Sequence, residues 1–403
     1  MSSAHFKGAV KASFWRGGTS KGIFFNFWDL PKWFQQTLRS DRAPDELQTK
    51  SLEQFFGAVM GSPDPYGRQL NGMGGGISSL SKAMVVCPPT QPGADVDYTF
   101  FQIGIKDGVI DMAGNCGNLS AAVGPFALNA GLYQTQGQGS DTGGGDRDKD
   151  RQIMMRMRNT NTRKIIEATF KVCKFNGNWQ FHYPGDTKID GVSSTASKIT
   201  LSFLDPEGSK TASALPTGNA VDIIRVDNLS VQASLVDVSN PGIFINGYEI
   251  GWNPKATPDE LNANRPLMDS LEKIRKKGTE MMGLDPQINS VPKIVMLFPP
   301  TDEQMDIACQ ALSMGQAHKA VPVTLALNLG VACKLKGTLP FRLSKHLSPS
   351  NTIIGHPSGT LEVGAAIGNG KIRSANLIRS SRCLMDGYVN TLGSDEEALE
   401  QDA

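Results

Sequence analysis

The sequence lacks features that mark several common classes of protein. Its 403 residues include 40 Lys or Arg and 39 Asp or Glu, so the net charge is only +1. A nearly neutral chain argues against nucleic-acid binding and against a polybasic membrane surface. No apolar run approaches the roughly 18–20 residues of a membrane span. The polar start from Met1 to Lys11 lacks the apolar stretch of a secretory signal.

Cysteine and histidine are sparse and scattered. The six cysteines lie far apart with no CxxC pair, which excludes a zinc ribbon, a dithiol motif and a disulfide framework. A reducing compartment, the cytoplasm, is therefore expected. The five histidines show no HxH or HxxxH spacing and no nearby carboxylate cluster, so we expect no metal site.

Glycine, by contrast, is abundant. The 43 glycines exceed the average usage of about 7% and they cluster, which suggests binding sites formed by the backbone. One cluster differs from the others, because residues 134–150 (QTQGQGSDTGGGDRDKD) contain no apolar side chain. Such a segment cannot bury a face, so we expect an acidic, glycine-rich loop in solvent.

Short apolar runs predict strands, and longer runs with helical spacing predict helices. The order is not a regular alternation of the two, so a doubly wound sheet is not favoured. The expected strands are Gly8–Trp15, Ala83–Cys87, Asp97–Ile105, Ile165–Lys174, Lys198–Phe203, Gln232–Val238, Gly242–Asn246, Lys293–Phe298 and Thr360–Ala366. The expected helices are Ser51–Met60, Asn118–Ala130, Pro266–Met282, Thr301–Leu312 and Gln316–Leu335.

Two of the predicted helices begin in the same way. A glycine turn at Gly114–Asn118 and another at Ser313–Gln316 each follow a strand-like segment and lead into an apolar helix. Two related halves would place two helix N-termini together. The likeness is too weak to establish a repeat from the sequence alone.

Three segments have residues suited to chemistry, and the first is Arg16–Gly22 (RGGTSKG). Consecutive glycines allow backbone N–H groups to point at an anion, and Arg16 and Lys21 add positive charge. The same residues fit equally well a hairpin turn with solvated basic side chains.

The second segment, Gly72–Lys82 (GMGGGISSLSK), resembles a phosphate loop but fails both tests. A Walker motif needs Gly where Ser81 stands, and GxGxxG needs Gly at Ile77. A glycine nest, three serine hydroxyls and one lysine remain, and this set suits carboxylates. If Lys82 is enclosed, burial would lower its pKa and fit it to act as a base. A lone lysine at the start of a strand is more often on the surface.

The third segment is Asn115–Asn118 (NCGN), at the start of a predicted helix. A thiol in the first turn of a helix meets the positive end of the helix dipole, which lowers its pKa and favours the thiolate. Free cysteines are commonly buried structural residues. The flanking Asn and Gly residues favour a reactive Cys116 over a structural one.

Nine motifs in this chain resemble, in their order, those of the PrpF-type isomerases, which comprise 2-methylaconitate cis–trans isomerase and its relatives. The matched stretches run from about Arg16 to Asp386, and the ordered set is specific. The chain departs from the family in segment 134–150 and at its two ends, none of which touches a motif. The motifs are RGGTSKG, GSPDPYGRQLNGMGGGISSLSK, DVDYTF, GNCGNLSAAVGPFALNAG, FLDPEGSK, LPTGN, NPGIFI, SMGQAHKA and GHPSGTLEVG.

The resemblance implies an α+β fold like that of diaminopimelate epimerase. Two pseudo-symmetric domains each wrap a sheet around a central helix, and the active-site cleft lies between them. We expect an N-terminal domain over residues 1–222 and a C-terminal domain over residues 223–370, with a strand at about 371–395 returning to the first domain. The family works without a cofactor and moves a proton on unsaturated di- and tricarboxylates.

The family's important lysine falls on Lys82 and its important cysteine on Cys116. Removal of a proton next to C=C–COO⁻ gives a dienolate, which hydroxyls, backbone N–H groups and helix N-termini would stabilise. We expect Lys82 and Cys116 to handle the proton, in roles that the sequence leaves open. Arg16, Lys21 and His318 are candidates for charge pairing. The residues expected to hold carboxylates are Ser20, Gly74, Gly75, Gly76, Ser78, Ser79, Asn115, Gly117, Asn118, Ser313, Met314 and Gly315.

Three alternatives stay open. Members of this family also act on 3-methylitaconate, aconitate or oxalomesaconate, although the motifs are closest to the 2-methylaconitate branch. An amino-acid epimerase on this fold uses two facing cysteines, and Ser313–Gly315 offers no second one. A non-catalytic relative would bind polycarboxylates without proton exchange, and the presence of Lys82 and Cys116 counts against it.

A homodimer is compatible with a two-domain isomerase but has no residue-level support.

Overall fold

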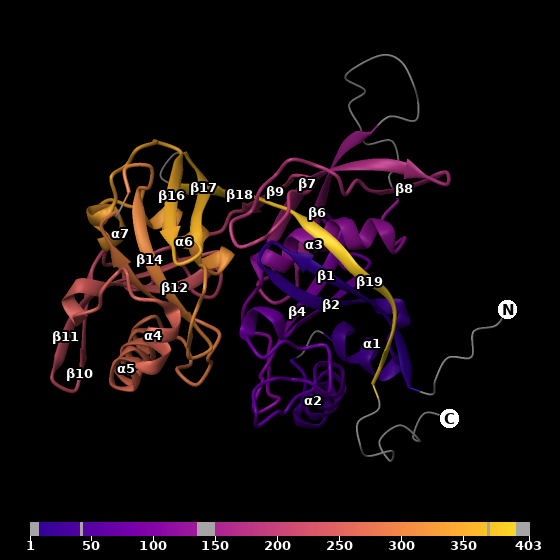
Figure 1. Cartoon of the computed structure of the whole chain (residues 1–403), viewed down its shortest axis with the longest axis horizontal. Coiled ribbons are helices and arrows are strands. Elements are labelled where there is room, and N and C mark those ends of the chain that lie inside the picture. The colour runs from indigo at the N-terminus through magenta and orange to yellow at the C-terminus, as the bar shows by residue number, and fades with distance from the viewer. Residues whose placement is uncertain (1–7, 41–42, 135–149, 301, 369–370, 392–403) are drawn as a thin grey trace.

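The computed structural model describes residues 8–40, 43–134, 150–300, 302–368 and 371–391. Two lobes lie side by side, the first built from the N-terminal half and the last strand, the second from the segment between them (Figure 1). The predicted loop at 134–150 falls, for residues 135–149, outside the described residues. Within the described part of the chain, no helix is long and apolar enough to cross a membrane.

The first lobe is a mixed sheet with one central helix and two helices on its outer face. Its strands are β1 (Ala9–Gly17), β2 (Ser20–Asn26), β3 (Lys82–Cys87), β4 (Val96–Ile103), β5 (Ile110–Asp111), β6 (Arg151–Asn159), β7 (Ile165–Phe175), β8 (Asn178–Phe181) and β9 (Ile199–Leu204). Its helices are α1 (Lys32–Arg39), α2 (Glu46–Met60) and the central α3 (Gly117–Asn129).

The second lobe has the same plan. Its strands are β10 (Asp222–Val226), β11 (Leu229–Val238), β12 (Asn240–Asn246), β13 (Lys293–Phe298), β14 (Ile307–Ser313), β15 (Gln316–Ala317), β16 (Asn351–His356) and β17 (Gly359–Gly368). Its helices are α4 (Pro258–Ala263), α5 (Arg265–Met281), the central α6 (Val323–Ala332) and α7 (Leu339–Leu343).

The order of elements repeats between the lobes. A hairpin (β1–β2 or β11–β12) is followed by two outer helices and by a strand that pairs in parallel with the second hairpin strand, β3 with β2 and β13 with β12. An antiparallel strand (β4 or β14), a short strand and the central helix come next. The two halves are therefore related, but the two predicted glycine turns do not occupy corresponding places: Gly114–Asn118 directly precedes α3, whereas Ser313–Gln316 forms the β14–β15 turn, one short strand before α6.

Both central helices are buried along nearly their whole length. Their residues are small or apolar on every side, so no face remains for solvent. Gly124 in α3 lets the ring of Phe170 pack directly on the helix, since a Cβ there would lie 2.6 Å from a ring carbon. This arrangement confirms the expected α+β fold, with a sheet wrapped around one helix in each lobe.

The last two strands connect the lobes. β18 (Lys371–Arg379) pairs with β17 of the second lobe and with β9 of the first. β19 (Ser381–Asn390) then pairs with β1, so the chain returns to the first lobe after residue 370. The division into domains at residues 1–222 and 223–370 stays a prediction.

Two predicted helices need correction. The helix expected at Thr301–Leu312 is wrong, because Ile307–Ser313 forms β14, which is paired on both edges. A strand buried on both faces gives a continuous apolar run that periodicity cannot tell from a buried helix. The helix expected at Gln316–Leu335 begins too early, because Gln316–Ala317 pairs back onto β14 and α6 starts only after Pro322.

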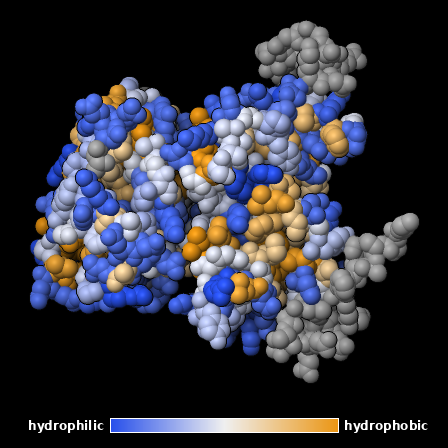
Figure 2. Space-filling model, viewed as in Figure 1, coloured by the Kyte–Doolittle hydropathy of each residue, from blue (hydrophilic) through white to orange (hydrophobic). Residues whose placement is uncertain are grey.

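Apolar side chains gather on the first lobe along β19, whereas the visible face of the second lobe is mostly hydrophilic (Figure 2). Leu384 in this strand is 45% exposed. Single exposed apolar residues are normal on a soluble surface, and the homodimer stays a prediction.

The packing of the central helices generates a test. A Cβ on Gly117, in the first turn of α3, would overlap Cγ1 of Val323 at the start of α6. We therefore expect Gly117→Ala to lower the free energy of unfolding by about 1–3 kcal/mol, with part of the loss recovered in Gly117→Ala/Val323→Ala. Urea unfolding measures both values. Gly387→Ala, at a site with open space around it, is the control, and an equal loss in that variant would contradict the packing argument.

Candidate active site

Two helices begin at one place between the lobes. α3 starts after Cys116 and α6 after Pro322, and neither N-cap side chain bonds to its helix. The first backbone N–H groups of both helices therefore lack partners within the helix. Residues from both first turns, Gly117 and Val323 among them, line the same cavity. The positive ends of two helix dipoles thus point into one space.

The β1–β2 hairpin packs onto the start of α3. Gly17 and Gly18 permit this, because side chains there would collide with the backbone or side chain of Asn118. The side-chain amide of Asn118 donates to Oγ1 of Thr19 at 3.1 Å. Ser20 follows, with its Oγ 4.0 Å from Sγ of Cys116. The segment RGGTSKG is therefore a hairpin turn and also delivers a hydroxyl to the thiol.

Lys82, the first residue of β3, is buried, with 8% of its surface exposed. Its ammonium donates to Oε1 of Gln102, its cross-strand neighbour on β4. The amide nitrogen of Gln102 donates to the carbonyls of Ser78 and Ser81, which keeps its oxygen turned toward the lysine. Burial lowers the pKa of Lys82, opposed by the nearby Cys116 and Asp111.

A second buried lysine faces the same cavity, and the sequence did not reveal it as a site residue. Lys293 is the first residue of β13, the strand that corresponds to β3 in the other lobe. Its Nζ donates to the carbonyl of Ser290 at 2.7 Å. Burial, followed by repulsion from Lys82, lowers its pKa to about 8. The signal that could have found it is its place in the repeat.

Polar side chains behind the cavity hold Asn115 in position. The hydroxyl of Tyr98 donates to Oδ1 of Asn115 at 3.2 Å and lies 2.9 Å from Oγ of Ser120. Ser120 also bonds to the carbonyl of Cys116 at 3.0 Å. With its oxygen engaged, Asn115 presents its amide N–H groups as donors.

His318 lies in the cavity but carries no charge at neutral pH. Burial is the main cause that lowers its pKa to about 4, and nearby Lys82 adds to the effect. Its Nδ1 accepts from the backbone N–H of Ala320 at 3.0 Å, so the neutral ring holds its proton on Nε2. His318 was expected to pair with a charged group. Its neutral ring can instead donate a hydrogen bond from Nε2.

The cavity has a volume of only about 40 Å³, so an organic ligand of several carbons could enter only if side chains or lobes moved. It is formed by both lobes. Of the predicted site residues, it gathers Ser20, Ser78, Ser79, Lys82, Asn115, Cys116, Gly117, Asn118, Ser313, Met314 and His318. Residues that the sequence did not indicate are Phe100, Gln102, Gly114, Ser290, Lys293, Pro322, Val323 and Thr324.

Six predicted residues lie outside the lining. The glycine nest, Gly74–Gly76, encloses the side chain of Gln69, whose Oε1 accepts from the N–H of Gly76 at 3.0 Å. Arg16 bonds to the carbonyls of Gly18 and Ser380. Lys21 lies over the ring of Phe14. Those not brought to the cavity are Arg16, Lys21, Gly74, Gly75, Gly76 and Gly315.

One group outside the cavity has metal-ligating residue types. Possible ligand atoms of Asp150, Cys173 and His182 lie within 4.8 Å of one another, and Nδ1 of His182 is 3.4 Å from Oδ2 of Asp150. A structural zinc site has four ligands, and this group supplies three.

The model of the PrpF protein family matches residues 8–392. The chain belongs to this family. Among its PrpF-family relatives, the 3-methylitaconate isomerase of Eubacterium barkeri is 33% identical over 394 residues, 93% of this chain and 95% of that protein. The 2-methyl-aconitate isomerase of Cupriavidus necator is 33% identical over 410 residues, 95% of this chain and 97% of that protein.

Among solved structures, a methylitaconate-delta-isomerase matches this PrpF-family chain with a TM-score of 0.71 and 32% sequence identity. The match covers 96% of this chain and 97% of the other. Together with the isomerase names of the two relatives, it identifies the chain as an isomerase.

The buried Lys293 gives stability a defined pH dependence. Its pKa is about 8 in the folded chain, against about 10.4 for an exposed lysine. Below pH 8 both states hold the proton, and the folded chain bears the full cost of burying it. Between about 8 and 10.4 the unfolded chain binds more protons, so stability rises with pH. We expect Lys293→Met to reduce that rise.

Urea unfolding between pH 7 and pH 10 measures the effect. Lys11→Met, at an exposed position on β1, should keep the wild-type slope of unfolding free energy against pH. A slope that is the same in Lys293→Met and in the wild type would contradict the cost assigned to Lys293.

Proposed function

We propose that this chain is a cofactor-independent isomerase of unsaturated di- and tricarboxylates, with cis–trans isomerisation of 2-methylaconitate as its reaction. The observation that carries the proposal is the convergence of two uncapped helix N-termini and two buried lysines on one cavity that also contains a thiol. The names of the 33% identical relatives, a 3-methylitaconate isomerase and a 2-methyl-aconitate isomerase, support the substrate class.

The cavity has separate donor sets for two carboxylates. One is the start of α3 with the hydroxyl of Ser20, from the first lobe. The other is the start of α6 with the ammonium of Lys293, from the second lobe. Helix N-termini bind anions through their free N–H groups and their dipole. A substrate with carboxylates at both ends would therefore bridge the lobes and be held with its middle carbons between them.

Lys82 removes the proton in this proposal. Two ammonium groups in one buried site repel each other, so one of the pair gives up its proton more readily than an exposed lysine does. The neutral amine of Lys82 takes a proton from the carbon next to the C=C–COO⁻ unit. The C–H bonding electrons move into the conjugated system as a dienolate, whose negative charge develops on a carboxylate facing helix N–H groups and Lys293.

Return of the proton decides the product. After rotation about the former double bond, return to the same carbon gives the cis–trans isomer. Return to the far end of the dienolate moves the double bond, which is the reaction of a 3-methylitaconate-type isomerase and the nearest alternative. Cys116, at the N-cap of α3, is the second group that can deliver the proton, so its placement against the bound acid selects between the two.

The lining counts against an amino-acid epimerase with two thiols. At the β14–β15 turn, the described lining offers Ser313 and Met314. Cys309 and Cys333 lie buried in the core. Cys116 is the one cysteine among the residues that line this cavity, so it has no facing partner there.

Single substitutions of the two proton-transfer residues test the proposal. We expect Lys82→Ala and Cys116→Ala each to lower kcat by about 10²–10⁴-fold, since each removes a general acid or base. The assay follows the conjugated absorbance of 2-methylaconitate, 3-methylitaconate, cis-aconitate and oxalomesaconate. Lys11→Ala and Cys383→Ala, which alter residues outside the cavity lining, should retain wild-type turnover. Near-wild-type kcat in either site variant would remove that residue from the mechanism.

The pH dependence of kcat/KM tests the separate roles of Lys82 as the base and Lys293 as the partner of a carboxylate. We expect a bell-shaped kcat/KM, rising as Lys82 loses its proton and falling at higher pH as Lys293 loses the charge that pairs with a carboxylate. In Lys293→Met the falling limb should disappear. The rising limb should move to higher pH because the repulsion on Lys82 is gone. An unchanged bell in this variant would show that Lys293 does not pair with the substrate.

A further inference from the structure

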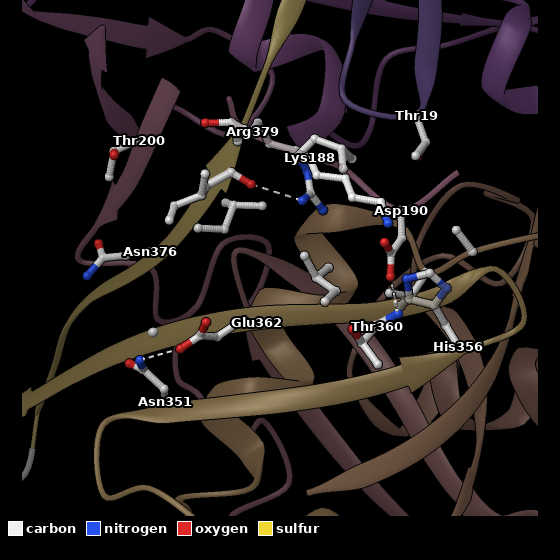
Figure 3. A pocket seen from close by; sticks show the side chains of 18 residues that line it. Thr19, Lys188, Asp190, Thr200, Asn351, His356, Thr360, Glu362, Asn376 and Arg379 are labelled. Carbon is white, nitrogen blue, oxygen red and sulfur yellow. Dashed lines mark hydrogen bonds between the residues drawn. The ribbon is translucent and has the colours of Figure 1, made fainter. Parts of the chain in front are cut away.

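A second and larger cavity lies beside the active site, with a volume of about 500 Å³. Strands β17, β18 and β9 and the segment around Asp190 surround it (Figure 3). It shares a wall with the active site. Thr19 lines this cavity and bonds to Asn118 of the other, and Ala320 and Val321 line it directly before Pro322.

Arg379, the last residue of β18, is a buried cation that forms no salt bridge with an acid among the described residues. Only 5% of its surface is exposed, and it lines the cavity together with Lys188 and Asp190 (Figure 3). Its Nη1 donates to the carbonyl of Ile378 at 3.0 Å, while its Nε is buried with no hydrogen-bond partner among the described residues. Burial lowers its pKa to about 10, so the guanidinium is still charged at neutral pH. An unpaired buried charge is costly unless an anion meets it.

The cavity's own carboxylates each accept a hydrogen bond from another residue of the lining. Asp190 accepts from the N–H of Thr360 at 2.9 Å, and Glu362 accepts from Asn351 at 2.6 Å. Burial lowers the pKa of His356 to about 4, so its ring is neutral. The lining thus has two cations, the buried Arg379 and the exposed Lys188, against two acids, so it favours a ligand with one negative charge over a ligand with several.

The lining also has an unsatisfied acceptor. Oδ1 of Asn376, on the same strand as Arg379, is buried with no hydrogen-bond partner among the described residues. A ligand that satisfies it must donate an O–H or N–H. The lining therefore suits a molecule that combines two features, an anionic group that pairs with Arg379 and a hydrogen-bond donor that reaches Asn376.

We propose that this cavity binds a small organic acid with one carboxylate and at least one hydroxyl or amino group, the carboxylate held by the guanidinium of Arg379 and a donor group held by Asn376. Guanidinium and carboxylate match in a bidentate geometry. The ligand is distinct from the unsaturated polycarboxylate of the active site, and its binding does not depend on the proposed reaction.

Titration calorimetry tests this with four probes. Gluconate and L-glutamine carry one carboxylate with donor groups, hexanoate carries the carboxylate alone, and inorganic phosphate is an anion without the organic body. We expect gluconate or L-glutamine to bind the wild type and hexanoate to bind more weakly. Failure of both donor-bearing probes to bind, or binding of phosphate alone, would overturn the proposal.

Variants locate the binding. Arg379→Gln should weaken the bound probe at least tenfold, and Asn376→Phe, which fills the cavity and retains the cation, should do the same if Arg379→Gln fails to fold. Arg373→Gln, an exposed arginine on the same strand, and Lys82→Ala in the active site should leave its affinity unchanged. Binding that survives both cavity variants, or that is lost in Lys82→Ala, would place the probe elsewhere and refute the site.

Discussion

The first turn of α3 lies directly against the first turn of α6, and the lack of a side chain at Gly117 is what permits this contact. Because each helix is the buried centre of its own lobe, the contact also sets how the lobes meet. Two uncapped N-termini then share one small space, which is positive in potential before any charged side chain is added. Burying Lys82 and Lys293 beside that space adds two positive charges whose hydrogen-bond acceptors, Oε1 of Gln102 and the carbonyl of Ser290, are neutral. The lowered pKa values of both lysines follow from this arrangement. A dianionic ligand would offset the positive charge of this site.

The repeat supplies the site in pairs, and the two members of each pair differ. Lys82 and Lys293 begin corresponding strands, yet Lys82 meets the amide of Gln102 while Lys293 donates to a backbone carbonyl. The N-caps correspond as well, and one is Cys116 while the other is Pro322. Two similar sets of carboxylate-binding groups with a single thiol suit an acid that has a carboxylate at each end and exchanges a proton at one carbon.

The sequence predicted those parts of the site where local pattern and chemistry coincide. Lys82 and Cys116 stand in unusual glycine- and serine-rich surroundings, so residue type alone pointed to them, and the family motifs agreed. Lys293 begins a strand whose sequence has no unusual feature, and only the three-dimensional repeat brings it to the cavity.

Gly74–Gly76 was expected to hold an anion, but the nest instead encloses the neutral amide of Gln69. A glycine nest shows that a backbone is open to a ligand, without telling whether the ligand is external or a side chain of the same chain. The helix expected at Thr301–Leu312 failed for a similar reason, since a doubly paired strand and a buried helix have the same apolar composition.

Proton exchange with solvent tests the central claim most directly. The wild-type enzyme is incubated in deuterated water with 2-methylaconitate, cis-aconitate and 3-methylitaconate, and proton NMR follows the carbon next to the C=C–COO⁻ unit. A dienolate formed in this cavity predicts deuterium at that carbon of at least one acid, at a rate that accompanies isomerisation and falls with Lys82→Ala. Isomerisation of these acids without any deuterium incorporation at early turnover, or incorporation that Lys82→Ala leaves unchanged, would contradict proton transfer by the residues assigned here.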